Sequence, residues 1–449
     1  MSAAQERADA VVVGARCAGS AAAAALARAG RRVVCIERAK FPADTLSTHL
    51  LFLGGVVELQ RLGALERVLA LGAPKLPQAM MAWGPHEIRT GYTPVEGLDY
   101  ALCVRRPGLD AALAETAREA GAEIREGCRA LSLIDEGGRV VGLRWADEGG
   151  GEHQLRAQLV VGADGRSSLV AREAGVEEPT LRNANGRGCY FAYWRDGRPE
   201  LRALAAQWRQ GRELVTAFPT DDGQLLVLLM PPVDRAPDFK HDLAGEYERT
   251  ARSIPGLADR LEGAELLTKV RHTNSTASYF RRSHGPGWAL AGDAGHFKDP
   301  VTAQGIRDAI RFGRLLGEAA APVLDDPAAL EAALAGWEQN RDAECIEMYQ
   351  WTNRLGRAEE MSPIEAELYR RGSTDPELAR SFLDVMARTR RPSEVLSARR
   401  VGGLIAGAVR HGDSGGAAVI RRGAAELRGA LADGVERTRF RLGAQPAAR

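Results

Sequence analysis

Three glycine-containing segments of the sequence have the residue types needed to bind an anionic cofactor through their backbone. They are residues 14–20 (GARCAGS), 162–168 (GADGRSS) and 292–296 (GDAGH), and each directly follows a short apolar run. A turn between a strand and a helix presents free N–H groups at the positive end of the helix dipole, where a phosphate binds. A single glycine-containing segment of this kind often forms only an ordinary polar loop. Three such segments, each after an apolar strand, favour one shared cofactor site.

The first segment has the pattern of a dinucleotide-binding turn. Gly14 suits the sharp turn, and Gly19 lets the helix that begins near Ser20 pack closely on the strand. Glu37 follows Gly14 by 23 residues, at the end of the next predicted strand, where a carboxylate meets the hydroxyls of a ribose. Arg16 departs from the pattern, because it replaces the middle glycine that normally lets a pyrophosphate approach the backbone. The alternative is a glycine-rich turn in an ordinary α/β fold.

The elements that position these segments follow from hydrophobic periodicity. Residues 10–13 and 33–36 predict buried parallel strands, and the alanine-rich stretch 20–29 between them predicts a helix, so the chain begins with a β-α-β unit. Residues 185–269 alternate short β-type runs with turns, which predicts an antiparallel sheet, and after Thr302 the pattern is almost wholly helical. Further helices are expected over 55–71 and 109–120, and further strands over 123–126, 130–134, 140–145, 154–161 and 288–291.

The three segments, in this order, resemble the motifs of the FAD-dependent oxidoreductase superfamily. That superfamily contains the para-hydroxybenzoate-hydroxylase-type (class A) flavoprotein monooxygenases, the flavin-dependent halogenases and the geranylgeranyl reductases. The resemblance implies an α/β fold: a Rossmann-like FAD-binding domain of the glutathione-reductase type, an inserted antiparallel-sheet substrate domain and a helical C-terminal region. It places the FAD-binding domain in 1–78, 101–184 and 271–375, the substrate domain in 79–100 and 185–270, and the C-terminal extension in 376–449.

The resemblance also implies which residues contact the cofactor. The first loop and Glu37 would hold the ADP half of FAD, and Asp164 with Gly165 would serve both FAD and NAD(P)H. Asp293 would bind the ribityl chain, and a helix that begins near Gln304 would direct its positive end at the flavin ring. The residues expected to contact FAD are Gly14, Arg16, Gly19, Ser20, Glu37, Arg38, Arg106, Ala130, Asp164, Gly165, Gly292, Asp293, Gln304, Gly305 and Ile306.

Candidates for catalysis and substrate binding lie outside the glycine segments. His49 follows a short loop that passes over the flavin in the superfamily, and Lys298 lies where the superfamily has a turn beside the ring, so both are candidate catalytic residues. A hydrogen-bonded histidine in a loop before a helix and a lysine that points into solvent are the alternative interpretations. Tyr190, Tyr193 and Phe218 belong to the predicted second sheet and are expected either to line a substrate pocket or to fill the core of that sheet.

The resemblance implies a function as well as a fold. The leading hypothesis is a monooxygenase that uses FAD, NAD(P)H and O₂ to hydroxylate or epoxidise a small organic substrate, aromatic or polyketide-like, through a flavin C4a-hydroperoxide. The motif around Asp164 and the absence of a second glycine fingerprint favour it. The alternatives are a double-bond reductase of the geranylgeranyl-reductase type and a non-catalytic flavin- or ligand-binding protein. A halogenase is disfavoured, because the sequence has no Trp-x-Trp-x-Ile-Pro stretch and Lys75 and Lys298 lack the expected setting.

Composition limits the remaining possibilities. The formal net charge of +1 gives no global field that would attract nucleic acid. The six cysteines form no CxxC pair and no histidine cluster has metal-ligand spacing, so we expect no metal site and a cytoplasmic protein with reduced thiols. Neither a signal peptide nor a membrane span is expected, and monomer and homodimer both remain open. The mildly basic C-terminal extension is expected to be a solvated face, with self-association, a cap over the substrate domain and contact with a membrane surface as alternatives.

Overall fold

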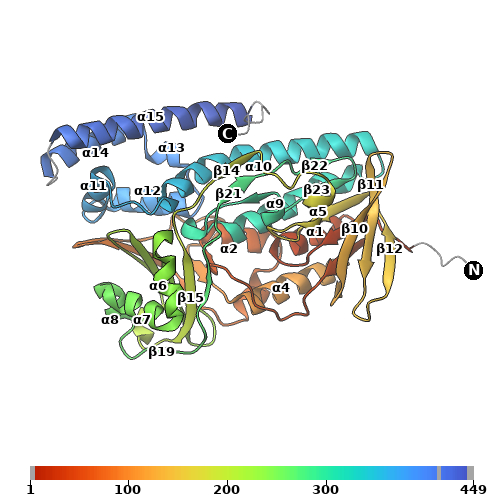
Figure 1. Ribbon diagram of the computed structural model, residues 1–449, viewed down its shortest axis with the longest axis horizontal. Coiled ribbons are helices and arrows are strands. Elements are labelled where there is room, and N and C mark those ends of the chain that lie inside the picture. Colours follow the sequence, from red (N-terminus) through yellow and green to blue (C-terminus); the bar gives the residue numbers. More distant parts are fainter. Residues whose placement is uncertain (1–5, 412–415, 442–449) are drawn as a thin grey trace, which may run out of the picture.

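The computed structural model describes residues 6–411 and 416–441 and is organised around a parallel sheet (Figure 1). The strand order is β22-β23-β13-β2-β3-β9, and all neighbours are parallel except the edge strand β22. The central strands are short runs of valine, isoleucine and leucine because both of their faces are buried. The strands are β2 (Ala10–Val13), β3 (Val33–Glu37), β9 (Glu123–Glu126), β13 (Leu159–Gly162), β22 (His284–Gly285) and β23 (Trp288–Leu290).

Helices cover the parallel sheet, and the closest pair is α1 with α9. A Cβ on Gly313 would lie 2.3 Å from the carbonyl oxygen of Ala18, so only glycine permits this separation of the two helices. The single helix expected over 55–71 is wrong, because Gly63 has a φ of +72° and separates two helices there. The helices of this layer are α1 (Cys17–Arg28), α2 (Leu53–Arg61), α3 (Leu65–Leu69), α4 (Arg106–Glu119), α9 (Gly305–Ala320) and α10 (Pro327–Gly356).

A second, four-stranded sheet has the order β1-β12-β11-β10. The single strand expected over 154–161 is wrong: β12 belongs to this sheet, whereas β13 belongs to the parallel one. The chain changes sheets at Ala157, whose N–H donates to the carbonyl of Val141, and Gln158, whose N–H donates to the carbonyl of Asp9. The strands are β1 (Glu6–Arg7), β10 (Arg129–Glu136), β11 (Arg139–Ala146) and β12 (Glu152–Arg156).

An eight-stranded sheet forms the other half of the molecule, and its strands are antiparallel except for the parallel pair β16–β6. Helices α6 (Ala236–His241), α7 (Leu243–Ser253) and α8 (Pro255–Arg260) cover its outer face, at the lower left of Figure 1. Its inner face packs into the main core, which also contains residues of the parallel sheet and its helices. The strands are β6 (Gln78–Trp83), β7 (His86–Gly91), β15 (Cys189–Arg195), β16 (Leu204–Gln210), β17 (Glu213–Pro219), β18 (Gln224–Met230), β19 (Glu265–Leu266) and β20 (Arg271–Thr273).

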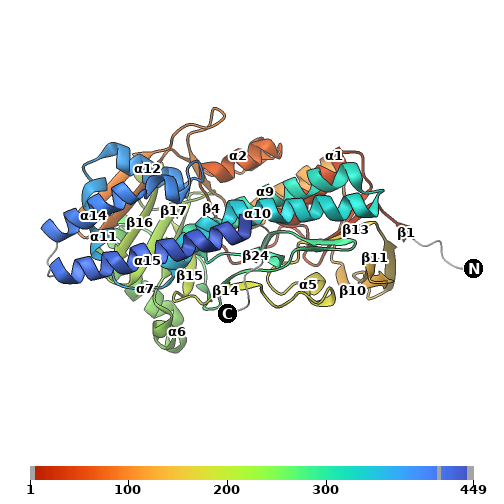
Figure 2. The same ribbon diagram turned by 90° about the horizontal axis from the view of Figure 1, so that it is seen from above.

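Five further helices follow α10 and form a layer on one side of the molecule, with α15 outermost (Figure 2). They are α11 (Pro363–Gly372), α12 (Pro376–Met386), α13 (Pro392–Val395), α14 (Ala398–His411) and α15 (Gly416–Arg441). Among the described residues no helix is long and apolar enough to cross a bilayer. The last residues of the expected extension, 442–449, lie outside the described part of the chain, and the expected domain boundaries remain a prediction. The remaining short elements are β4 (Leu50–Leu51), β5 (Lys75–Leu76), β8 (Ala101–Cys103), β14 (Leu181–Asn183), β21 (Ser278–Phe280), β24 (His296–Phe297) and α5 (Leu169–Glu173).

Candidate cofactor and substrate site

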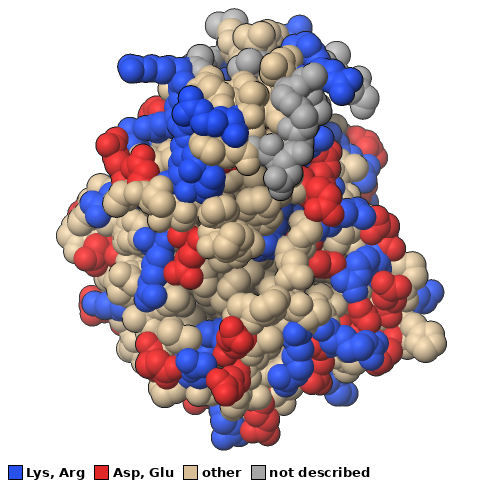
Figure 3. Space-filling view, turned by 90° about the vertical axis from the view of Figure 1, so that its left-hand side faces the viewer, with Lys and Arg blue, Asp and Glu red and all other residues tan. Residues whose placement is uncertain are grey.

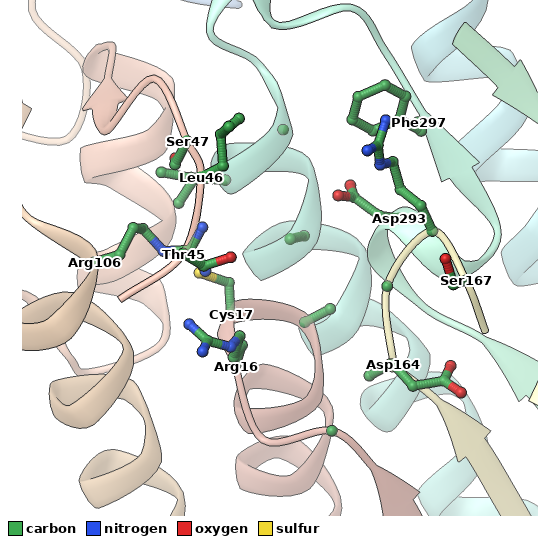
Figure 4. A pocket seen from close by; sticks show the side chains of 18 of the residues that line it. Arg16, Cys17, Thr45, Leu46, Ser47, Arg106, Asp164, Ser167, Asp293 and Phe297 are labelled. Carbon is green, nitrogen blue, oxygen red and sulfur yellow. The ribbon is translucent and has the colours of Figure 1, made fainter. Parts of the chain in front are cut away.

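A cavity of about 630 Å³ opens at the carboxyl ends of the parallel strands, where the three glycine segments meet. This is the edge at which open α/β sheets bind their ligands. Arg16 and Arg106 lie on one side of it, and Asp164, Asp293 and Phe297 lie on the other (Figure 4). Eleven of the fifteen residues expected to contact FAD line this cavity, and Gly19, Ser20, Gly292 and Gln304 do not.

The first glycine segment makes the tight turn expected of it. Gly14 has a φ of +93°, and a Cβ there would lie 2.5 Å from the carbonyl oxygen of Ala163. A Cβ on Gly19 would lie 1.7 Å from the carbonyl oxygen of Gly14. The hydroxyl of Ser20 donates to the carbonyl of Ala15 at 2.6 Å, so Gly19 and Ser20 shape the turn from behind the cavity wall.

The carboxylate of Glu37 joins the end of β3 to this turn. It accepts a hydrogen bond from the Ala15 N–H at 2.7 Å and one from the Ala39 N–H at 2.8 Å. Two acceptor positions of a carboxylate are thereby used and two remain, because an ionised carboxylate offers about four. Glu37 lines the cavity and can still accept hydrogen bonds from a ligand hydroxyl.

The side chain of Arg16, which replaces a glycine of the turn, is held by partners on other segments. Its guanidinium pairs with Asp110 of α4 and donates to the carbonyl of Ala43 at 3.2 Å. Arg106 binds the same carboxylate at 2.8 Å. Helix α1 has no side-chain cap at its N-terminus, so its first N–H groups are available to an anion.

The second glycine segment uses its aspartate for internal structure. The Asp164 carboxylate accepts from the Ser168 hydroxyl at 2.6 Å and from the Leu169 N–H at 2.7 Å, and burial raises the pKa of Asp164. Arg166 reaches across to the carbonyl of Ser275 and lies 4.9 Å from the ring of Phe297. Sequence reasoning missed Arg166 and Phe297 as cavity residues, although Arg166 lies inside the second glycine segment and Phe297 directly follows the third.

The third glycine segment presents a carboxylate to the cavity. Burial raises the pKa of Asp293, and its carboxylate receives no hydrogen bond from the described residues, although Arg166 and Arg106 lie near enough to favour its charged form. Helix α9 begins at Gly305 without a side-chain cap, and a Cβ there would meet nothing within 4 Å. An unpaired carboxylate and an uncapped helix end beside open space are both suited to a polar ligand.

Lys298 lines the cavity, but its ammonium group is not free. It pairs with Asp308 of α9 and lies 3.0 Å from Nε2 of His296. Burial would raise the pKa of Asp308, but Lys298, Arg388 and Arg307 outweigh it and hold that pKa well below its ordinary value. His296, Asp308 and Cys345 bring possible metal ligands within 4.8 Å of one another. The ammonium group of Lys298 already supplies the positive charge among them.

His49 lies behind the cavity wall, which differs from its expected place beside the cofactor. It is fully buried, its Nε2 lies 2.7 Å from the hydroxyl of Tyr193, and its Nδ1 has no partner among the described residues. Burial, reinforced by the charge of Arg106, lowers the pKa of His49 to about 3, so the ring is neutral at pH 7. The backbone of His49 has a φ of +61°, which turns the ring inward, whereas residues 45–48 line the cavity.

A small apolar pocket adjoins the cavity on the side of the eight-stranded sheet. Thr48, Pro300 and Ala303 line both spaces. The pocket therefore adjoins the end of the larger cavity that lies next to the N-terminus of α9. Its free volume is only about 10 Å³. The other residues that line it are Leu50, Phe52, Gln207, Thr216, Phe218, Leu228, Met230, Val301, Thr302 and Met386.

The three aromatic residues expected at a substrate pocket separate in the structure. Phe218 lines the small pocket, and Tyr193 faces the same side of the sheet but is covered by His49. Tyr190 lies on the outer face, where its ring stacks on Phe239 at 4.0 Å, so of the two expectations the structure agrees with a place in the core of the sheet. Residues an odd number of positions apart on a strand point to opposite faces. Lys75 is exposed and lies over the Tyr100 ring, away from the cavity.

The residues present fit an FAD molecule. The uncapped end of α1 and the remaining lone pairs of Glu37 suit the pyrophosphate and a ribose. The unpaired carboxylate of Asp293 suits a chain of hydroxyl groups, and the open space at Gly305 suits a flat ring. The cavity volume lies in the range of cofactor pockets.

Comparison with protein families agrees with this geometry. The family model described as "FAD binding domain" matches residues 7–352. A tryptophan 2-halogenase of Chondromyces crocatus is 27% identical over 68% of this chain and 59% of its own length. A digeranylgeranylglycerophospholipid reductase of Methanosarcina acetivorans is 30% identical over 50% of this chain and 54% of its length, so the chain spans little more than half of these two relatives. A menaquinone reductase of Mycobacterium tuberculosis is 32% identical over 70% of this chain and 76% of its length.

Solved structures share the fold. The flavin-dependent brominase Bmp2 superposes with a TM-score of 0.74 at 20% sequence identity, over 88% of this chain and 97% of its own. PqsL of Pseudomonas aeruginosa, described as a probable FAD-dependent monooxygenase, superposes with a TM-score of 0.65 at 20% identity, over 84% of this chain and 99% of its own. The glutathione-reductase-type arrangement with an inserted sheet and a helical C-terminal region is therefore confirmed.

Proposed function

The chain belongs to the FAD-binding domain family, and on that premise we propose that it is a monooxygenase that uses NAD(P)H and O₂ to oxygenate an apolar organic substrate. FAD, when bound, accepts hydride from NAD(P)H and provides the reactivity toward O₂. The protein contributes binding, orientation and exclusion of water. The observation that supports this proposal is the apolar pocket that adjoins the cofactor cavity at the N-terminus of α9.

Residues of the cavity hold the cofactor and set the charge around its ring. The N-terminus of α1 binds the pyrophosphate, Glu37 a ribose and Asp293 the ribityl hydroxyls. The N-terminus of α9 and the residue Lys298 line the same end of the cavity. The helix end carries positive charge and therefore favours an anionic form of a bound ring, whereas the charge of Lys298 is already matched by Asp308.

Residues of the pocket admit the substrate and keep water out. Leu50, Phe218, Met230 and Met386 are apolar walls, and Thr216 offers a hydroxyl that has no partner among the described residues. Because the free volume is about 10 Å³, these side chains must move apart before an organic molecule enters. Met230 and Met386 suit that movement, since the methionine side chain is unbranched and adaptable. His49 acts as a positioning residue that holds the loop over residues 45–48.

The test is a measurement of turnover by the FAD-loaded protein. NADH or NADPH oxidation and O₂ uptake are followed across a panel of phenols, polyketides and isoprenoid quinones. We expect one substrate to raise both rates together and to give a product that is 16 mass units heavier in air and 18 mass units heavier under ¹⁸O₂. A protein that stays colourless after FAD is added contradicts the whole proposal, and a product that requires bromide or chloride contradicts the oxygenase step.

A double-bond reductase is the second candidate, because the pocket is apolar and a menaquinone reductase is 32% identical to this chain. In that case the substrate gains two hydrogens, and the reaction proceeds without oxygen. An anaerobic incubation with dithionite-reduced protein and an isoprenoid quinone separates the two functions. A product that is still two mass units heavier after its quinol ring has been reoxidised to the quinone in air favours the reductase, because the two hydrogens are then on the isoprenoid chain. No such product under argon, together with ¹⁸O incorporation under ¹⁸O₂, favours the monooxygenase.

A further inference from the structure

The two outermost helices, α14 and α15, carry most of the exposed large apolar side chains of the described residues. Four of six lie there, whereas Val233 and Leu267 are isolated elsewhere. The four are Val409 on α14 and Ile420, Leu431 and Val435 on α15, and Leu431 is 73% exposed. Exposed apolar residues are ordinary when they are scattered, but a cluster on adjacent helices indicates an interaction surface.

The apolar residues of α15 form one stripe with arginines beside it. At 3.6 residues per turn, Ile420, Leu431 and Val435 fall within about 60° of one another around the helix axis. A second set, Arg421, Arg428 and Arg439, falls along one edge of the stripe. All three arginines are exposed, and none has an acidic partner among the described residues. Helix α14 adds Arg399 and Arg410 to its exposed side.

The acidic residues of α15 point toward the body of the protein instead. Asp433 pairs with Arg354, and Glu436 accepts from the side-chain amide of Gln350 at 2.8 Å. Glu426 is partly buried, which raises its pKa. The outward side of α15 is therefore apolar and cationic, although the helix contains both signs of charge. Lys and Arg side chains gather over the ends of these helices at the top of Figure 3.

We propose that this face, defined by Arg399, Val409, Arg410, Ile420, Arg421, Arg428, Leu431, Val435 and Arg439, docks the protein on an anionic lipid bilayer. An amphipathic helix with arginine beside a shallow apolar stripe lies in the interface plane, where the apolar side chains enter the lipid and the guanidinium groups bind phosphates. A second copy of the chain is a poorer occupant, because two such faces would bring like charges together. The inference stands apart from the proposed function, since it concerns a different surface.

The experiment is co-sedimentation of the FAD-loaded full chain with extruded vesicles. We expect binding to phosphatidylcholine vesicles that contain 30% phosphatidylglycerol, and at least tenfold weaker binding to phosphatidylcholine alone. Replacement of Arg421, Arg428 and Arg439 by glutamine should weaken binding about a hundredfold, since each basic residue near an anionic surface contributes about fivefold. The Leu431→Gln, Val435→Gln variant should weaken it about tenfold. Binding should fall between 0.1 and 0.5 M NaCl.

The matched control replaces three exposed arginines of other elements, Arg7, Arg144 and Arg172, by glutamine. It removes the same charge and should leave vesicle binding within about twofold of the unaltered protein. Equal losses in the control and in the Arg421, Arg428 and Arg439 variant would overturn the proposal, as would absence of binding to anionic vesicles. Sedimentation equilibrium measures whether the protein is a dimer. A dimer that dissociates in the Leu431→Gln variant would assign the face to self-association and would also overturn the proposal. The vesicle experiment measures neither FAD absorbance nor turnover. A failure of the membrane proposal therefore leaves the proposed function intact.

Discussion

The cofactor cavity takes its shape from the backbone, whereas the small pocket beside it takes its shape from side chains. At Gly14, Gly165 and Gly305 the main chain turns or leaves space, and the chemistry comes from N–H groups at helix ends. The pocket is formed by Leu50, Phe218, Met386 and other side chains of four separate parts of the chain.

This difference predicts how the cofactor cavity and the small pocket each respond to mutation. A backbone site fails when one residue can no longer take its conformation, because no neighbour can compensate for a lost turn. A side-chain site changes gradually, since neighbouring residues repack around an altered volume. The predictions below test this contrast from the largest expected effect to the smallest.

Gly14→Val should have the largest effect and should act on the cofactor cavity alone. A side chain there meets the Ala163 carbonyl at 2.5 Å and requires a φ of +93°. We expect FAD affinity to fall on the order of 1000-fold, measured by titration of flavin fluorescence. Gly336→Ala is the control, because a Cβ at this helical position meets nothing within 4 Å and should leave FAD affinity unchanged. Retained yellow colour after dialysis of the Gly14 variant would refute the backbone interpretation.

Lys298→Met should destabilise the protein where the cofactor cavity adjoins the small pocket. It leaves the buried Asp308 without its ammonium partner, and the loss of one member of a buried pair costs about 3 kcal/mol. The free energy of unfolding in urea measures this cost. Lys240→Met removes an exposed lysine that has no ion-pair partner in the described part of the chain, and it should change that free energy by less than about 0.5 kcal/mol. Equal stability of the two variants would mean that the Lys298–Asp308 pair contributes nothing.

His49→Asn should flatten the acid dependence of stability. The pKa of His49 is lowered from 6.5 to about 3, so the unfolded chain binds one more proton than the folded protein between these values. The unaltered protein therefore loses stability as the pH falls from 6.5 toward 3, and this histidine contributes up to about 1.4 kcal/mol per pH unit. Asparagine tolerates the left-handed backbone and does not titrate. Urea midpoints at pH 7, 6 and 5 should differ less in the variant, and parallel curves would exclude a buried neutral ring.

Thr216→Val should have the smallest effect and should sharpen the contrast. The Thr216 hydroxyl is buried beside the pocket and has no partner among the described residues, so its replacement should stabilise the substrate-free protein by about 1 kcal/mol. FAD affinity should stay the same, whereas KM for the substrate should rise if the hydroxyl binds it. The comparison variant is Thr220→Val, whose hydroxyl donates to Asp221 at 2.8 Å and whose loss should be destabilising. Stabilisation of both variants would show that the partnerless hydroxyl is not the cause.

The cofactor half of the molecule was the more predictable one because its signals are local. Each glycine segment and the strand before it lie within about ten residues, and the structure brings Gly14, Asp164 and Asp293 to one edge of the sheet. The pairing of Arg16 with Asp110 was not predictable, since 94 residues separate them. The sequence pattern also could not show that the Asp164 carboxylate accepts hydrogen bonds from Ser168 and Leu169 at the start of the next helix.

The substrate half was predictable only in outline. Strand alternation alone places Tyr190 and Tyr193 on opposite faces, so the sequence pattern already indicates that the two rings cannot line one pocket. Burial of His49 depends on a positive φ, for which the loop at residues 45–48 carries no glycine or other cue. Met386 lies outside the region that carries the motifs, and only the packing of α12 brings it to the pocket.

The side-chain amide of Gln304 has a consequence for redesign. It donates to the carbonyls of Thr302 and Met386 at 2.9 Å each, and so fastens the end of α12 to the start of α9. The family match ends at residue 352, well before Met386. One wall of the pocket is thus encoded downstream of every residue that lines the cofactor cavity. Chimaeras joined after residue 357 would alter the pocket only at the wall formed by Met386, while the cofactor cavity and the other walls remained the parental ones.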